Sequence, residues 1–261
     1  MKKAVFFDID GTILDCLNGI NDMTIGVKKA IRELQRRGNY VFIATGRPYA
    51  FLNDSLQNFG FDGFVFVNGA HVEVGGKCIY KEPIKKESIK ELVHNFDKFN
   101  VQYILQGEKY SYIKDKYKKL HSFYKDFSIS KKYLKNDYNI EDIDTYKIEM
   151  ICDDKKGVEY CFSLENHNYN YIYYDEKNYL ELYSKANTKA SGILKALDFL
   201  NIPLENSYAF GDGKNDIEML SQVGCGIAMG NASDVVKSSA KIVTDTVQND
   251  GVALAIEKFI L

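Results

Sequence analysis

The chain of 261 residues contains little proline and little cysteine. Three prolines beside 45% apolar residues exclude Pro-rich disordered and fibrous proteins and are typical of an ordinary globular one. The five cysteines are odd in number, widely scattered and without a C-x-x-C pair. This pattern argues against a disulfide framework and against a thiolate zinc site.

A large excess of one charge sign is also missing. The net charge of −2 gives no general reason to bind nucleic acid or an anionic membrane, and we expect neither as a partner. No apolar run approaches the ~20 residues of a membrane span, and the first one ends at Asp8, short of the roughly 7–15 residues of an export signal. We therefore expect a cytoplasmic protein, in which the sequons at Asn53 and Asn231 carry no meaning. The oligomeric state stays open.

Short apolar runs alternate with helical patterns in the first third of the chain. Strands are predicted over residues 4–7, 40–44 and 64–67, and helices over about 24–37 and 48–59. This β-α-β-α-β order implies a parallel sheet with right-handed crossovers. The same style resumes at Thr188 with a helix to about Leu200, a strand at 207–210, a helix at 216–223, short strands at 226–229 and 241–243, and a terminal helix from Gly251.

The middle of the chain has a different character. It is rich in Lys, Tyr and Asn, with a predicted helix over 87–99 and predicted strands over 101–105, 147–152, 169–174 and 179–183. We therefore predict an α/β core domain, residues 1–82 and 186–261, interrupted by an inserted α+β domain, residues 83–185. A hairpin turn is predicted at Asn68-Gly69.

Polar residues follow three of the predicted parallel strands. Asp8, Thr45 and Asp212 each come at the end of such a strand, next to or near a glycine. In an open α/β sheet, ligands bind in the crevice outside the carboxyl ends of the strands. We therefore expect these three side chains to converge on one site, although they are far apart in the sequence.

The first of these clusters is Asp8-Ile9-Asp10-Gly11-Thr12. Gly11 permits a turn after the strand, so that both carboxylates can face the crevice. One can then attack an electrophile and form a covalent aspartyl intermediate, while the other donates and accepts protons. A β-turn with two solvated acids is the alternative. A calcium loop is excluded, because glycine stands at the fourth place and no Glu follows at the twelfth.

The second cluster, Gly211 to Asp216, predicts a metal site. Asp212 and Asp216 bring the crevice to about four formal negative charges with Asp8 and Asp10, which cannot stay close without compensation. Mg²⁺ suits this set because it accepts a few carboxylates, keeps several waters and bridges to phosphate.

A phosphate ligand also needs hydrogen-bond donors. Arg47, the one arginine outside a predicted surface helix, could contact the substrate or clamp the inserted domain, and both readings stay open. The candidate donors are the Thr45 hydroxyl, the Asn215 amide, Lys189 and the backbone N–H groups around Ile9, Asp10 and Gly46.

The chain resembles the haloacid dehalogenase (HAD) superfamily of phosphatases in four ordered motifs, which are Asp8-x-Asp10-Gly11-Thr12, Thr45-Gly46-Arg47, Lys189 and Gly211-Asp212-Gly213-Lys214-Asn215-Asp216. More narrowly, it is similar to the Cof-like phosphatases, whose large α+β cap is inserted between the second and third motifs. The resemblance covers the whole chain and implies a Rossmannoid parallel-sheet core with an inserted cap.

The resemblance also implies roles for the motif residues. Asp8 is the expected nucleophile and Asp10 the expected general acid and base. The other implied roles are phosphate binding by Thr45, Lys189 and Asn215, Mg²⁺ ligation by Asp212 with Asp8 and the Asp10 backbone carbonyl, and support of the metal or of Lys189 by Asp216.

We expect a Mg²⁺-dependent phosphatase that hydrolyses small phosphate monoesters, with sugar phosphates first, through an aspartyl-phosphate. Asp10 favours ester hydrolysis over dehalogenation, because an alkoxide leaving group needs a proton and a halide does not. Two alternatives stay open. One is a phosphomutase of sugar phosphates, and the other is a phosphoacceptor or sugar-phosphate sensor without turnover.

Overall fold

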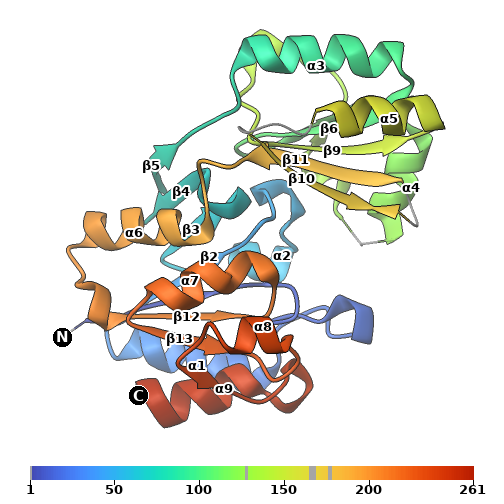
Figure 1. Ribbon diagram of the computed structural model, residues 1–261. Coiled ribbons are helices and arrows are strands. Elements are labelled where there is room, and N and C mark those ends of the chain that lie inside the picture. The colour runs from blue at the N-terminus through green and yellow to red at the C-terminus, as the bar shows by residue number, and fades with distance from the viewer. Residues whose placement is uncertain (1, 127–128, 165–168, 176–177) are drawn as a thin grey trace. The chain divides into compact units, whose positions relative to one another are not determined.

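The computed structural model describes residues 2–126, 129–164, 169–175 and 178–261 (Figure 1). It divides into two compact units, which we call the core and the cap. The core comprises Met1–Gly46, Asp54–Lys81 and Asn187–Leu261, and the cap comprises Arg47–Asn53 and Glu82–Ala186. The segment Arg47–Asn53 thus groups with the cap, and the domain limits at 82 and 185 stay predictions.

The core is built on one eight-stranded sheet. Its strands follow the order β14 (Ile242–Val243), β13 (Cys225–Ala228), β12 (Ser207–Gly211), β1 (Ala4–Phe7), β2 (Tyr40–Ala44), β3 (Gly63–Phe66), β4 (His71–Val74) and β5 (Lys77–Lys81). From β14 to β3 all neighbours are parallel, which confirms the predicted α/β sheet. The sequence did not predict the two antiparallel strands β4 and β5 that extend this sheet.

Helices cover both faces of the core sheet (Figure 1). One face carries α1 (Ile25–Arg36) and α9 (Gly251–Ala255), and the other carries α6 (Lys189–Leu200), α7 (Ile217–Gln222) and α8 (Asp234–Lys237). α1 begins where predicted, because the Thr24 hydroxyl accepts a hydrogen bond from the Val27 N–H at 3.1 Å. Its buried side chains recur every three or four residues, so that one stripe faces the sheet.

The helix predicted over 48–59 is confirmed only at Asp54–Asn58, and the prediction of one continuous helix is wrong. The structure has a short 3₁₀ turn at Tyr49–Phe51 and a separate helix α2 (Asp54–Asn58), with an extended backbone at Leu52 between them. Ala50 and Phe51 are buried in the hydrophobic cluster of the cap, whereas α2 belongs to the core. The segment breaks because its two halves pack into different units.

The cap contains a six-stranded sheet with helices on it. The strand order is β10 (Tyr169–Tyr174), β11 (Tyr179–Ser184), β9 (Lys147–Cys152), β6 (Val101–Gln106), β7 (Ser111–Ile113) and β8 (Leu134–Lys135). All neighbours are antiparallel except the parallel pair β7 and β8. Helices α3 (Lys86–Lys98) and α5 (Lys155–Ser163) lie along one face, and α4 (Lys118–Asp126) contacts the other through Tyr124 (Figure 1).

No helix among the described residues combines the length and the apolar character that crossing a bilayer would need.

The turn between β3 and β4 brings α6 to its place. Val67, Asn68 and Gly69 all have positive φ angles, of 47°, 51° and 92°. A Cβ atom on Gly69 would lie 2.1 Å from the backbone oxygen of Thr188, the residue that caps α6. Glycine is therefore required here both by the left-handed backbone and by the close approach of the helix.

We predict that Gly69→Ala destabilises the core more than Gly75→Ala. Both glycines have a left-handed backbone, which costs alanine roughly 1–2 kcal/mol, but a Cβ on Gly75 would meet nothing within 4 Å. The clash at Gly69 should add about 1–3 kcal/mol. Urea unfolding of the two variants measures the difference, and equal losses of unfolding free energy would show that α6 does not depend on this contact.

Candidate active site

Three neighbouring strands of the core end at the predicted site. β12, β1 and β2 are adjacent and parallel, and Asp8, Thr45 and Asp212 follow their carboxyl ends directly. The backbone holds the first two in place, since the Asp8 N–H donates to Phe210 O at 3.0 Å and the Thr45 N–H donates to Val65 O at 2.8 Å. Parallel pairing therefore brings together residues that are distant in the sequence.

Lys189 lies at the centre of the site. It is the first residue of α6, whose start is fixed by the Thr188 hydroxyl accepting from the Ser191 N–H at 3.2 Å. Its side chain is 1% exposed, and Nζ lies 2.6 Å from Asp8 Oδ1 and 2.6 Å from Asp216 Oδ1. One buried ammonium thus bridges the first and the last of the four motifs.

Asp216 is fully buried, and both of its carboxylate oxygens already accept hydrogen bonds. Its Oδ1 accepts from Lys189, and its Oδ2 accepts from the backbone N–H groups of Asp212 at 3.0 Å and of Gly213 at 2.8 Å. Hydrogen bonds to an ionised carboxylate are short and strong. Asp216 therefore fixes both the lysine and the loop that carries Asp212.

Thr12 and Gly11 complete this side of the site. The Thr12 hydroxyl is 3.3 Å from Asp212 Oδ1 and 3.5 Å from Asp8 Oδ2, so it links the two carboxylates. Gly11 has a φ of +78°, and a Cβ there would lie 2.1 Å from Asp212 Oδ2. The glycine predicted to turn the chain is also needed for the approach of Asp212.

The electrostatics of the site favour an additional cation. Burial and the charge of Asp216 raise the pKa of the Asp8 carboxyl well above its ordinary value, and the same causes raise the pKa of Asp212 to about 6. Burial alone would lower the pKa of the Lys189 ammonium, but the carboxylates of Asp216 and Asp8 raise it. Ligand atoms of Asp8, Asp212 and Asp216 all lie within 4.8 Å of one another.

Asp10 and Ile9 form the turn after β1. Asp10 is exposed and pairs with Leu14 in an isolated β-bridge. The Ile9 side chain is fully buried, and its carbonyl oxygen accepts from three N–H groups, those of Thr12, Ile13 and Leu14, at 2.9–3.2 Å. Any contribution of Ile9 to ligand binding must therefore come from its backbone.

Gly46, Asn68 and Asn215 lie side by side. The Asn215 side-chain amide donates to Asn68 Oδ1 at 3.1 Å, and a Cβ on Gly46 would lie 3.2 Å from that oxygen. Arg47 belongs to the cap, where its guanidinium donates to Phe51 O at 3.0 Å. The structure thus brings Asn215 to the Thr45-Gly46 strand end, and the role of Arg47 stays a prediction.

Sequence reasoning assigned no role to three residues of this site. Thr12 stood in the first motif, Asn68 was taken only as a turn residue, and Asn231 was set aside as a sequon. Asn231 donates through Nδ2 to Gly11 O at 2.8 Å and lies 3.5 Å from Asp212 Oδ2. Thr12 could have been found from the motif, whereas nothing near Asn231 in the sequence indicates this contact.

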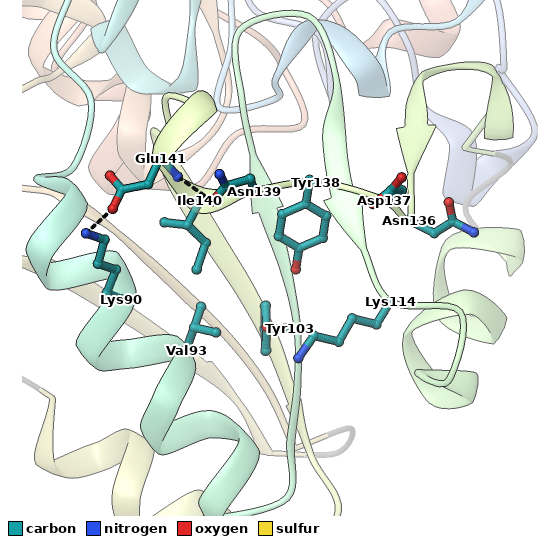
Figure 2. Close-up of a pocket in the computed structure, with 10 residues that line it drawn as sticks. All are labelled: Lys90, Val93, Tyr103, Lys114, Asn136, Asp137, Tyr138, Asn139, Ile140 and Glu141. Carbon is teal, nitrogen blue, oxygen red and sulfur yellow. Dashed lines mark hydrogen bonds and ion pairs between the residues drawn. The ribbon is translucent and has the colours of Figure 1, made fainter.

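A pocket of about 580 Å³ lies in the cap, and no predicted site residue lines it (Figure 2). Tyr103 and two lysines, Lys90 and Lys114, are among the residues that line it. Lys90 is paired with Glu141, as Figure 2 shows, and Lys114 Nζ lies 2.9 Å from Asp97 Oδ2. Because both cations are already neutralised, we assign this pocket no part in the chemistry.

Comparisons with known proteins agree with the geometry. The family model of haloacid dehalogenase-like hydrolases matches residues 5–256. YkrA of Bacillus subtilis (strain 168) is 32% identical over 260 residues, which cover 98% of this chain and 97% of YkrA. The 5-amino-6-(5-phospho-D-ribitylamino)uracil phosphatase YcsE of the same organism is 30% identical over 268 residues, covering 99% and 96% of the two chains.

A solved structure extends the likeness to the fold. The structure described as the HAD subclass IIB sugar phosphatase BT4131 superposes with a TM-score of 0.79 at 28% sequence identity, over 99% of each chain. The predicted family and fold class, a parallel-sheet core with an inserted α+β cap, are thereby confirmed. The chain belongs to the family of haloacid dehalogenase-like hydrolases, and it is a phosphoric monoester hydrolase of that type.

Proposed function

We propose that the protein is a Mg²⁺-dependent phosphatase that hydrolyses sugar phosphates and related small esters through an aspartyl-phosphate on Asp8. The observation that carries this proposal is the Asp8 carboxylate itself. It stands at the end of a central strand, held through Oδ1 by Lys189 at 2.6 Å, with Asp212 beside it. A carboxylate oriented in this way can attack phosphorus while the ammonium offsets charge on the phosphoryl oxygens.

The donor set of the site fits Mg²⁺. One ammonium offsets only one of the three clustered carboxylate charges, and carboxylate oxygens are the ligands that Mg²⁺ prefers. We assign Asp8, Asp212 and the backbone carbonyl of Asp10 as ligands. Asp216 is assigned to support Lys189 and the Asp212 loop, because both its oxygens already accept hydrogen bonds. Bound Mg²⁺ would neutralise charge on the substrate phosphate.

Phosphoryl transfer then needs two carboxylates in different roles. An Asp8 oxygen attacks phosphorus, the P–O bond to the alcohol breaks, and Asp10 gives its proton to the departing oxygen. Water next attacks phosphorus, and its proton passes to the Asp10 carboxylate. The aspartyl P–O bond breaks, inorganic phosphate leaves, and both residues return to their starting states.

The remaining predicted residues are assigned to the phosphoryl group. We propose that the Thr45 hydroxyl, the backbone N–H groups of Ile9 and Gly46, and the Asn215 amide bind its oxygens together with Lys189. Thr45 is 1% exposed and sits on a strand end that is fixed by backbone hydrogen bonds. A donor held rigidly in this way loses little entropy when it binds the transferred group.

Two of the compared proteins favour a polyhydroxylated substrate. The name of YcsE describes a phosphate carried on a ribityl chain, and BT4131 is described as a sugar phosphatase. Both are similar to this chain over nearly its whole length. We therefore place sugar phosphates and sugar-alcohol phosphates first among the candidate esters.

We predict that phosphate release from such esters requires Mg²⁺ and Asp8. Addition of EDTA, or the substitution Asp8→Asn, should lower the rate by at least about a thousandfold, because each removes a group on which attack depends. Asp198→Asn, on the exposed side of α6, is the matched control and should keep the native rate. Isomerised sugar phosphate without free phosphate would contradict the proposal and indicate a mutase.

We predict that Asp10→Asn separates the two halves of the reaction. p-Nitrophenolate leaves without a proton, whereas hydrolysis of the aspartyl-phosphate still needs a base. The variant should therefore release a burst of nitrophenolate equal to the enzyme concentration and then turn over slowly. Mass spectrometry of the quenched protein should find one phosphoryl group on the peptide that contains Asp8.

The same variant should hydrolyse sugar phosphates about 10²–10⁴-fold more slowly than the native protein, since an alkoxide cannot leave unprotonated. A linear time course with the aryl ester, together with an unmodified Asp8 peptide, would exclude the covalent intermediate.

A further inference from the structure

The turn between β3 and β4 holds one asparagine rigidly beside the candidate phosphate donors. Asn68 has a φ of 51° and a ψ of 40°, a left-handed conformation that asparagine adopts more readily than most residues. Its backbone N–H donates to Thr45 O at 3.0 Å, and the residue is 7% exposed. The next residue, Gly69, packs against the start of α6. Asn68 is therefore fixed from both sides.

The side chain of Asn68 joins two parts of the candidate site. Its Oδ1 accepts a hydrogen bond from Asn215 Nδ2 at 3.1 Å. A Cβ on Gly46 would lie 3.2 Å from the same oxygen and 3.5 Å from Asn68 Nδ2, so the amide also packs on the strand end after β2. Gly46, Asn68 and Asn215 all belong to the core. One side chain thus connects the Thr45-Gly46 strand end to the loop after β12.

Asn215 can bind phosphate with only one end of its amide. The residue is exposed and lies in the short 3₁₀ turn Lys214–Asp216. A side-chain amide carries an acceptor oxygen and an NH₂ group with two hydrogens. In water such an amide rotates freely, and its oxygen would repel a phosphate that its NH₂ group would bind. The orientation of this amide therefore decides whether Asn215 favours or opposes an anion.

The hydrogen bond to Asn68 fixes that orientation. It uses one hydrogen of Asn215 Nδ2 and holds this nitrogen where a Cβ on Gly46 would lie 3.7 Å away. Within the described ranges of the chain, the second hydrogen of this nitrogen has no protein acceptor. The donor end of the amide thus lies at the strand end that carries Thr45, with one hydrogen left for a ligand.

We propose that Asn68 is a positioning residue, which turns the Asn215 amide so that its NH₂ group faces the phosphate oxygens. This inference rests on the proposed function, in which Asn215 binds the phosphoryl group. Asn68 acts through Asn215 and needs no contact with the substrate. Because the bond between the two residues exists before the ligand binds, the phosphate does not have to order an exposed side chain, and less conformational entropy is lost on binding.

The test is a double-mutant cycle of Asn68→Gly and Asn215→Ala, with inorganic phosphate as the probe in calorimetric titrations of the Mg²⁺-loaded protein. Glycine removes the acceptor and adopts the left-handed backbone without strain. Asn215→Ala should raise the phosphate Kd at least about tenfold, because hydrogen bonds to charged groups are strong. Asn68→Gly should raise it at least about threefold, since the amide is then free to rotate.

The double variant decides between action through Asn215 and independent action. It should bind phosphate no more weakly than Asn215→Ala alone, because the orienting residue has nothing left to orient. Additive losses in the double variant, or a native Kd in Asn68→Gly, would overturn the inference.

Asn201→Gly is the matched control. Asn201 is exposed and ends α6 with nearly the same backbone angles, a φ of 52° and a ψ of 43°. The same substitution there should leave the phosphate Kd native. Melting temperatures of the two glycine variants are measured in parallel. A larger loss of melting temperature in Asn68→Gly, together with a native Kd, would assign Asn68 to the fold and overturn the inference.

Turnover gives an independent readout. All phosphate esters share the phosphoryl group, so Asn68→Gly should lower kcat/KM by the same factor for ribose 5-phosphate and for p-nitrophenyl phosphate. A loss confined to one of the two esters would overturn the inference, because it would mean a contact with the leaving group.

Failure of the proposed function has a different signature. A native protein that binds phosphate but hydrolyses no ester contradicts the phosphatase proposal, while the titrations of the cycle still decide the role of Asn68. A native protein that hydrolyses esters but shows additive losses in the cycle contradicts this inference alone. A native protein that binds no phosphate overturns both.

Discussion

The buried ammonium of Lys189 between Asp8 and Asp216 is the contact on which the rest of the core depends. Breaking a buried ion pair by removing one partner costs about 3–5 kcal/mol. The three chain segments that carry Asp8, Lys189 and Asp216 must therefore all be in place in the folded core. Gly69 and Gly192 let α6 approach the β3 end of the sheet closely enough, since a Cβ on Gly192 would lie 2.5 Å from Val65. The sheet order then fixes the other two partners.

The core and the cap bury different kinds of polar group. In the core, Lys189 pairs with the carboxylates of Asp8 and Asp216, and burial together with the charge of Asp216 raises the pKa of Asp8 and Asp212, which favours a cation at this site. In the cap, Gln106 and Ser111 bury neutral groups beside a neutralised lysine.

Local sequence patterns correctly predicted the strands and helices whose formation depends mainly on residues near one another in the chain. The strands β2, β9 and β10 occur at the residues where apolar or alternating runs predicted them, and α1 begins at its Thr24 cap. The helix expected over 48–59 failed because its apolar residues are divided between two units, which no window of sequence shows. The antiparallel strands β4 and β5 were missed because both are short, and because β4 pairs with β3 only after the turn at Asn68, while β5 pairs with β4.

The sequence by itself determined which residues form the candidate site. Its four short motifs contain the carboxylates, the lysine and the glycines, and strand-end placement predicted that they would meet, because parallel strands present their carboxyl ends at one edge. Only the tertiary structure decided how they meet. The two carboxylate oxygens of Asp216 accept hydrogen bonds from Lys189 and from the Asp212 loop, and the Asn231 side chain donates to the Gly11 carbonyl. Among the described residues, the Gln106 amide has no hydrogen-bond partner, whereas the Gln102 amide has partners. Such differences depend on neighbours contributed by distant segments, and packing alone brings those segments together.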